Sequence, residues 1–157
     1  MTAKKPGGEA VAATNRKAWH DYFILEKFEA GLVLTGTEVK SLRDGKANLK
    51  DSYVTFKNGE AWLFGLHISP YSHGNIQNHD PERTRKLLLH RRQIDKLAAE
   101  STIKGNAVVP LRLYFKEGRA KAEIAVVKGK KEYDKRDAKR SREADREIAA
   151  VIKHGRR

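Results

Sequence analysis

The distribution of aromatic residues sets the strongest limit on where this chain can build a hydrophobic core. All twelve Phe, Trp and Tyr residues lie between Trp19 and Tyr133, and the last 24 residues contain none. Aromatic side chains bury large areas and dominate cores, so a core cannot extend far into the C-terminal segment. A chain of 157 residues is about one domain long. We therefore expect a flexible N-terminal arm over 1–14, one folded body over 15–129 and a tail over 130–157.

The chain is strongly basic, with a formal net charge of +13. Residues 128–157 carry a net +6 and residues 1–127 carry the other +7. Such a surface attracts polyanions. The apolar residues Ala144, Ile148 and Val151 or Ile152 form only a narrow helical stripe in the tail. We expect the tail to be disordered when free and helical only when docked.

Composition also excludes several function classes. The absence of Cys rules out disulfides, thiolate zinc sites and cysteine nucleophiles. No apolar run approaches the roughly 18 residues of a membrane span, and no secretory signal begins the chain, so we expect a cytoplasmic protein without a membrane partner. His67, His73 and His79 recur every six residues without carboxylates at metal-site spacing. We expect no metal, no cofactor and no enzymatic activity.

Short β-rich segments fill most of the body. Asn58-Gly59 and Glu117-Gly118 each separate two such segments and predict tight hairpins. A short helix is predicted from Thr37 to Arg43, with Thr37 as its cap, and another in the second half of 83–99. Six strands with two to three accessory helices predict a mainly β fold: a small closed or partly closed antiparallel barrel.

Three basic segments carry the signals for nucleic-acid binding. They are 15–20, which mixes cations with Trp19; 83–92, which wraps five positive charges around three leucines; and 128–136, which contains Tyr133. Three successive leucines cannot all face inwards on a strand, so one should be exposed. Each segment also has an alternative without RNA binding. Segment 15–20 could be a flexible basic arm with Trp19 buried in the barrel, segment 83–92 a buried leucine end with a solvated basic rim, and segment 128–136 a solvated linker.

Several motifs together resemble the small protein B family, the SsrA-binding proteins of bacterial trans-translation. They are Asn15-Arg16-Lys17-Ala18, Phe28-Glu29-Ala30-Gly31, Gly36 to Arg43, Gly45-Lys46-Ala47-Asn48, Asp51-Ser52-Tyr53, Arg85 to Leu89, and Lys128 to Lys131 with Asp134-Lys135-Arg136. The resemblance runs from about Asn15 to the C-terminus. It implies an OB-type barrel that binds the tRNA-like domain of transfer-messenger RNA and enters the A site of a stalled 70S ribosome.

The resemblance, together with the basic segments, implies three groups of site residues. The RNA-binding group is Asn15, Arg16, Lys17, His20, Glu29, Lys86, Leu88, Lys121, Lys128 and Gly129. The tail group for the decoding centre is Lys131, Tyr133, Asp134, Lys135 and Arg136, and the group for the mRNA channel is Val151, Ile152 and Lys153. Trp19 stands where relatives often have Arg, and Tyr133 where some have His.

The expected partners are therefore transfer-messenger RNA and the ribosome, bound by a monomer, without DNA or membrane. A general single-stranded or ribosomal RNA binder on an OB barrel is the alternative. A metal-dependent nuclease using the His67 loop ranks last.

Overall fold

The structure is a computed structural model that describes residues 4–5, 9–72, 77–131, 136, 139–140, 142–144 and 146. Its helices are α1 (Arg16–Asp21), α2 (Gly36–Arg43) and α3 (Arg91–Ser101). Its strands are β1 (Lys4–Lys5), β2 (Glu9–Thr14), β3 (Tyr22–Leu32), β4 (Ala47–Asn48), β5 (Tyr53–Lys57), β6 (Glu60–Phe64), β7 (His67–Ile68), β8 (Arg85–Leu88), β9 (Asn106–Lys116) and β10 (Arg119–Gly129).

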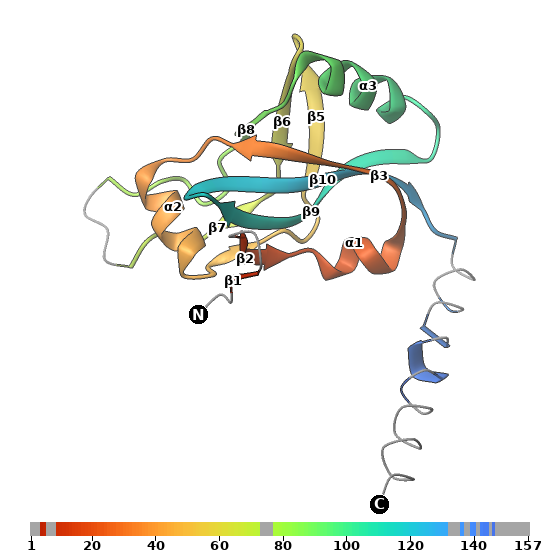
Figure 1. The fold of residues 1–157 in the computed structure, drawn as a ribbon, viewed down its shortest axis with the longest axis horizontal. Helices are drawn as coiled ribbons and strands as arrows, with labels where there is room; N and C mark the ends of the chain where they lie inside the picture. Colours follow the sequence, from red (N-terminus) through yellow and green to blue (C-terminus); the bar gives the residue numbers. More distant parts are fainter. Residues whose placement is uncertain are drawn as a thin grey trace, which may run out of the picture.

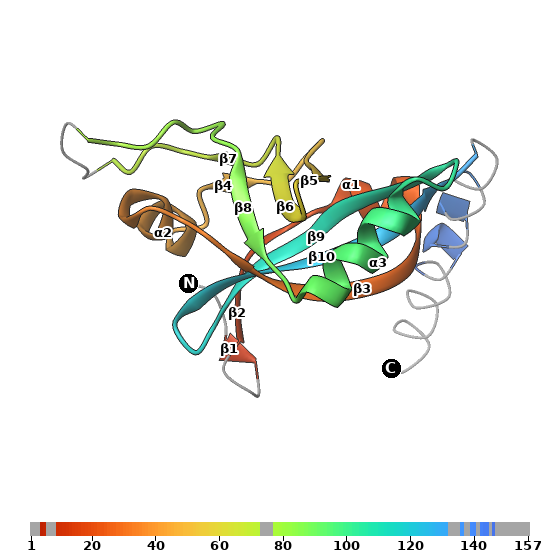
Figure 2. The same cartoon turned by 90° about the horizontal axis from the view of Figure 1, so that it is seen from above.

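One antiparallel sheet organises these elements. Its strand order is β1-β2-β9-β10-β3-β8-β6-β5, and β4 and β7 form a separate pair. The long strands β9, β10 and β3 lie side by side, with α1 and α3 on opposite sides of them (Figure 1). Seen from above, β8, β6 and β5 run across the direction of the long strands, so the sheet is strongly coiled (Figure 2).

The two predicted hairpins are confirmed. Asn58 and Gly59 join β5 to β6, and Glu117 and Gly118 join β9 to β10. All four residues have positive φ, between 52° and 77°. This is the backbone that a type I′ turn requires, and its twist matches that of the flanking strands.

The predicted closed or partly closed barrel is confirmed only in part. The fold is mainly β and antiparallel, and β5 packs against β9 across the core. Among the described residues, however, no backbone ladder joins β5 to β9 or to β2, so the sheet is not closed by hydrogen bonds.

Several short elements were not predicted. Residues 4–5 and 9–14, expected in a flexible arm, form β1 and β2, and β2 lies on the edge of β9, where the Glu9 carboxylate forms an ion pair with Arg112. Residues 47–48 form β4. Residues 85–88 form β8, and 16–21 form α1. The first long strand of the body, β3, is continuous over eleven residues. Short segments of small or mixed residues carry little periodicity, so pairing with longer strands decides their structure.

The core has two parts on opposite sides of the long strands. The main core includes Leu63, Leu87 and Ile124, and Leu97 of α3 closes it at one end. A smaller cluster forms where Ala18 of α1 packs on Leu111 and neighbouring β9 and β10 residues. The helix thereby covers one end of the face that points away from the main core.

A buried ionic cluster joins α2 to β8. Glu38 and Arg85 have no solvent exposure, and the Arg85 Nε donates to a Glu38 carboxylate oxygen. The other Glu38 oxygen accepts from Arg83 at 2.6 Å and from the backbone N–H of Thr35 at 2.8 Å. Thr35, rather than the predicted Thr37, is therefore the N-cap residue of α2. Arg85 also donates to the carbonyl of Leu66 at 2.5 Å.

The ionised state of Glu38 is strongly favoured in the folded protein. Burial alone would raise its pKa, but the hydrogen bonds from Arg83, Thr35 and Arg85 lower the pKa from 4.5 to about 2. The charged carboxylate therefore stabilises the fold fully above the unfolded pKa near 4.5, and this contribution disappears as the pH falls through 2.

Glu38→Gln should lower the free energy of unfolding at pH 7 by about 3–5 kcal/mol, because Arg85 would stay buried without its counter-charge. The difference from the parent protein should shrink as the pH falls from 4.5 to 2, because the carboxylate becomes protonated in the unfolded parent while it is still ionised in the folded parent, so the parent loses stability. Urea unfolding of both proteins at pH 7 and pH 3 measures this. Glu60→Gln, which breaks an exposed pair with Lys86, is the control and should cost less than about 1 kcal/mol. An equal difference at both pH values would contradict the assignment.

Candidate RNA-binding surface

The side of the sheet opposite the main core presents a continuous polar face, here called the outer face. It consists of Arg112, Tyr114 and Lys116 on β9; Arg119, Lys121 and Glu123 on β10; Lys27, Glu29 and Gly31 on β3; and Leu88 on β8. Alternate residues of a strand share a face, which explains why these positions occur at intervals of two. Five of these ten residues are cationic.

Strand register brings Glu29, Leu88 and Lys121 together. Gly31 pairs with Lys121 on one side and with Leu88 on the other, and Glu29 lies two residues along on the same face. These three residues, here called the Glu29 cluster, are far apart in sequence. Their proximity fits the resemblance that selected them.

Leu88 is the outward member of the leucine triplet, as predicted. Leu88 is 54% exposed, whereas Leu87 is buried. A Cβ on Gly31 would lie 3.1 Å from the Leu88 Cβ, so the absence of a side chain at 31 lets β3 and Leu88 approach closely. The Leu88 side chain therefore lies next to the bare backbone of Gly31 on the outer face.

A groove of about 390 Å³ begins at Leu88. Apolar side chains from the end of β3 and from α2 line it, together with two cations of β10: the lining residues are Gly31, Leu32, Val33, Leu34, Val39, Leu88, Arg119, Ala120 and Lys121. An unstacked base can pack on the leucine and valine side chains, while Arg119 and Lys121 neutralise its phosphates. Chemically, the groove therefore suits a nucleotide.

The carboxylate of Glu29 is fixed from below. Tyr114, which is only 1% exposed, donates its hydroxyl to Glu29 Oε2 at 2.5 Å, and the Lys116 ammonium lies 3.6 Å from the same oxygen. The Tyr114 hydrogen bond is the main reason that the pKa of Glu29 is lowered, while burial and the Glu29 charge raise the pKa of Tyr114. Both contacts use Oε2, so the half-exposed carboxylate can accept from a base amino group through Oε1.

Arg112 crosses the middle of the outer face. Its guanidinium contacts Glu9 at 3.3 Å and Glu123 at 3.2 Å, and it lies 4.3 Å above the Tyr114 ring. Arg112 therefore holds Tyr114 from above while Glu29 holds its hydroxyl. The acidic residues of this face are engaged with cations or with Tyr114, which reduces their repulsion of phosphate.

The N-terminal group of predicted residues lies around α1. Asn15 is buried: its Oδ1 accepts from the Ala18 N–H at 3.2 Å, and its Nδ2 donates to the Pro110 carbonyl at 2.9 Å. It caps the helix and ties it to β9. Arg16 is exposed, and His20 contacts Asp21 at 2.8 Å.

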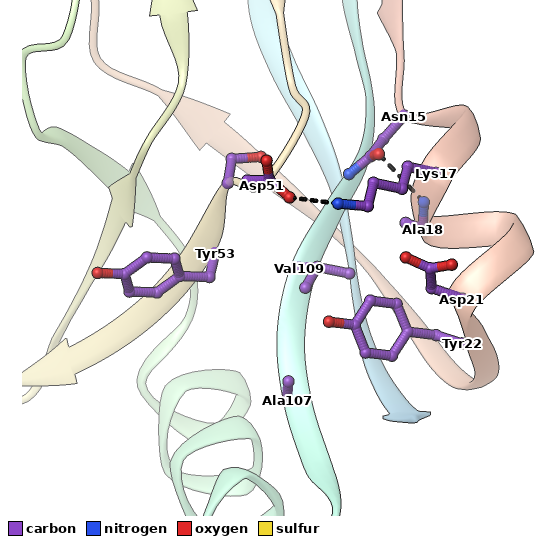
Figure 3. Close-up of a pocket in the computed structure, with 10 residues that line it drawn as sticks. Asn15, Lys17, Ala18, Asp21, Tyr22, Asp51, Tyr53, Ala107 and Val109 are labelled. Atoms are coloured by element: carbon purple, nitrogen blue, oxygen red, sulfur yellow. Dashed lines mark hydrogen bonds and ion pairs between the residues drawn. The ribbon is translucent and has the colours of Figure 1, made fainter. Parts of the chain in front are cut away.

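Lys17 borders a hollow of about 200 Å³ between α1, β9 and the start of β5 (Figure 3). Its ammonium contacts Asp51 at 2.7 Å, and this contact raises the pKa of Lys17. Tyr22 and Tyr53 flank the hollow, and Ala107 and Val109 lie between them. Lys17 is thus engaged with a carboxylate that a phosphate would have to replace.

The predicted RNA-binding residues form two groups at opposite ends of β3. Lys128 and Gly129 pair with Phe23 and Tyr22, close to α1, whereas Lys121 pairs with Gly31. Nine residues of strand separate Tyr22 from Gly31, roughly 30 Å. Lys86 lies on the same side of β8 as Leu88 and contacts Glu60 at 3.1 Å.

The tail residues are mostly outside the described part of the chain. Lys131 and Arg136 are described and exposed. The predictions for Tyr133, Asp134, Lys135, Val151, Ile152 and Lys153 fall on residues that the structure does not describe.

The histidines show no metal-site arrangement within the described ranges, where no three His, Asp or Glu residues group together as ligands. His67 contacts Glu82 at 2.7 Å, and His79 contacts Thr37 and the Ile68 carbonyl. His73 lies outside the described residues. Of the described helices, none has the length and apolar character needed to cross a membrane.

The sequence did not identify Tyr114, Arg119 or Val33 as members of the site. For Tyr114 a signal existed, because it alternates with Arg112 and Lys116 on the polar side of β9. For Arg119 and Val33 there was none, since their positions depend on the register of β3 with β10 and β8.

Tyr114→Phe should raise the pKa of Glu29 towards its ordinary value, because the Tyr114 hydrogen bond contributes most to the lowering. A carboxyl carbon NMR titration of Glu29 measures this. Lys116→Met should also raise the pKa of Glu29, because the ammonium lowers it through its charge and through a hydrogen bond. An unchanged pKa of Glu29 in the Tyr114 variant would contradict the arrangement.

Comparisons with known proteins agree with the resemblance. Residues 12–154 match the family described as SmpB protein. An SsrA-binding protein of Desulforudis audaxviator is 60% identical over 96% of this chain and 97% of its own length. One from Enterococcus faecalis is 55% identical over 97% of this chain and 99% of its own length. A chain of the solved structure "tmRNA-SmpB: a journey to the center of the bacterial ribosome" matches with a TM-score of 0.67 at 48% identity, covering 76% of this chain and 85% of that chain.

Proposed function

Because the chain belongs to the SmpB family, we propose that it binds the tRNA-like domain of transfer-messenger RNA and delivers it to stalled ribosomes. It acts in trans-translation, the rescue of stalled ribosomes with tagging of the incomplete protein, and it does so by binding RNA rather than by catalysis. One molecule of the protein accompanies each RNA in the cytoplasm.

The observation that supports a specific RNA site is the Glu29 cluster. An exposed leucine and a lysine line an apolar groove, and a carboxylate held by Tyr114 lies two residues along β3 from Gly31 of the same groove. On a surface that bound only the phosphate backbone, a fixed carboxylate would lower the affinity, because it repels phosphate. A carboxylate that accepts from a base edge, beside an apolar platform for an unstacked base, instead favours recognition of a particular folded RNA.

The residues around α1 form the second part of the proposed surface. Arg16, Lys17, Lys128 and Gly129 would contact RNA at the other end of β3, with Lys17 exchanging Asp51 for a phosphate. Asn15 is proposed to act indirectly, since it holds α1 against β9. Lys86 would add charge beside Leu88.

The body is proposed to be an OB-type barrel, supported by the coiled sheet and by the packing of β5 on β9. In this proposal the tail over 130–157 becomes helical on the ribosome. Lys131, Tyr133, Asp134, Lys135 and Arg136 would meet the decoding centre, and Val151, Ile152 and Lys153 would follow the empty mRNA channel.

Leu88→Asp should weaken binding of a tRNA-like transcript about tenfold or more, because it replaces an apolar contact with a charge that repels phosphate. Gel shifts with the transcript measure this. Ile103 is exposed to a similar extent but lies after α3, away from the outer face, so Ile103→Asp is the matched control and should bind normally. Equal weakening by both variants would contradict a specific site.

Truncation after Gly129 should leave transcript binding nearly intact and abolish tagging, because the body binds RNA and the tail engages the ribosome. Gel shifts and a reconstituted tagging assay on the same preparations test the division. A transcript with a mutated elbow loop should bind more weakly to both forms. Binding that is equal for every RNA of the same length would instead favour a general RNA-binding protein.

A further inference from the structure

Trp19 is exposed to an unusual degree for its type. The residue is 46% exposed, although tryptophan is normally among the most buried residues. The Lys27 ammonium lies 5.0 Å from the centre of its ring. The ammonium therefore forms a cation–π contact with the indole, and much of the ring remains exposed to solvent.

The position of Trp19 follows from the packing of α1. Ala18 is buried against the sheet, while Arg16 and Trp19 lie one turn apart on the exposed side of the helix. The same packing rules out the arrangement in which Trp19 is tucked into the core. An exposed cation and an exposed aromatic ring are therefore neighbours on a short, well-anchored helix.

Trp19 also extends the outer face. Lys27, Glu29 and Gly31 alternate along β3, so the lysine that contacts the indole lies in the same row as the Glu29 cluster. Four residues of strand separate Lys27 from Gly31, about 13 Å. A single stretch of RNA along β3 can therefore reach the Glu29 cluster and Trp19 together.

The charges around Trp19 favour RNA over an apolar protein partner. Arg16 is exposed, and within the described ranges the Lys27 ammonium forms an ion pair with Glu123 at 4.0 Å. A single ring among cations is too small for an apolar docking patch. Aromatic rings among cations are typical of surfaces on which bases stack.

We propose that Trp19 is a stacking platform for an unpaired base of the same RNA that occupies the Glu29 cluster, with Arg16 contacting the adjoining phosphate. This inference rests on the proposed function. In this inference the Trp19 contact is non-ionic: Trp19 contributes base stacking and does not neutralise a phosphate.

Intrinsic fluorescence tests the contact directly. The chain has two tryptophans, so Trp62→Phe leaves Trp19 as the only reporter. Titration of this variant with the tRNA-like transcript should quench its emission, with the same midpoint as the gel shift. In Trp19→Phe, where Trp62 is the reporter, the transcript should cause weaker quenching, because Trp62 lies opposite Lys86 and not against the stacked base. Saturated binding without quenching of Trp19 would overturn the proposal.

The salt dependence of binding separates stacking from ion pairing. Trp19→Ala should weaken transcript binding about 5- to 50-fold and leave the slope of log Kd against log salt unchanged. Trp19→Arg should make that slope steeper by roughly 0.7 to 0.9, the effect of one added phosphate contact. Ile103→Ala, the control for loss of an exposed apolar side chain, should change neither value.

The outcomes distinguish this inference from the proposed function. If Leu88→Asp weakens binding and Trp19→Ala does not, the stacking role is wrong while the proposed function stands. A normal affinity of Trp19→Ala combined with a loss of tagging would mean that Trp19 serves another partner, which also overturns the inference. If neither variant affects transcript binding, the proposed function itself fails.

Discussion

The buried pair of Glu38 and Arg85 is the constraint on which the position of the groove beside Leu88 depends. Arg85 is held by Glu38 and by the carbonyls of Leu66 and Pro81, so it fixes the start of β8 against α2 and the end of β6. With Arg85 and Leu87 directed inwards, alternation directs Lys86 and Leu88 outwards. A buried ion pair contributes little net stability but is costly to break. Here it also determines which of these two leucines is exposed on the sheet.

The electrostatic design of the outer face is more selective than its net charge implies. Excess positive charge alone would bind any RNA, with an affinity that depends strongly on salt. Glu29 adds a fixed hydrogen-bond acceptor among these positive charges, because Tyr114 holds its carboxylate and Arg112 lies above the Tyr114 ring. Since the carboxylate is already oriented before binding, RNA recognition does not have to supply the entropy of ordering it.

Sequence reasoning predicted the features that local chemistry decides. The hairpins at Asn58-Gly59 and Glu117-Gly118 and the helix of α2 followed from turn and helix preferences. The exposed Leu88 followed from strand alternation. The Glu29 cluster came from family resemblance, because no local pattern joins three strands.

The features that were missed depend on tertiary pairing. β2 and β8 are short and gain their structure from β9, β3 and β6. α1 has six residues and is stabilised by the Asn15 cap and by the packing of Ala18. Tyr114 had the correct alternation, but its contact with Glu29 requires β10 to lie between β9 and β3 in the known register.

The order of strands in the sheet has a consequence for biosynthesis. β9 and β10 occupy the middle of the sheet but are translated last among its strands. β2 cannot complete its pairing with β9 until residue 116 has left the ribosome that is making the chain, and β3 cannot complete its pairing with β10 until residue 129 has left it. Folding of the body is therefore delayed until nearly the whole polypeptide is available, as expected for a topology dominated by distant contacts. A ribosome that stopped early on this message would release a fragment without the centre of its sheet.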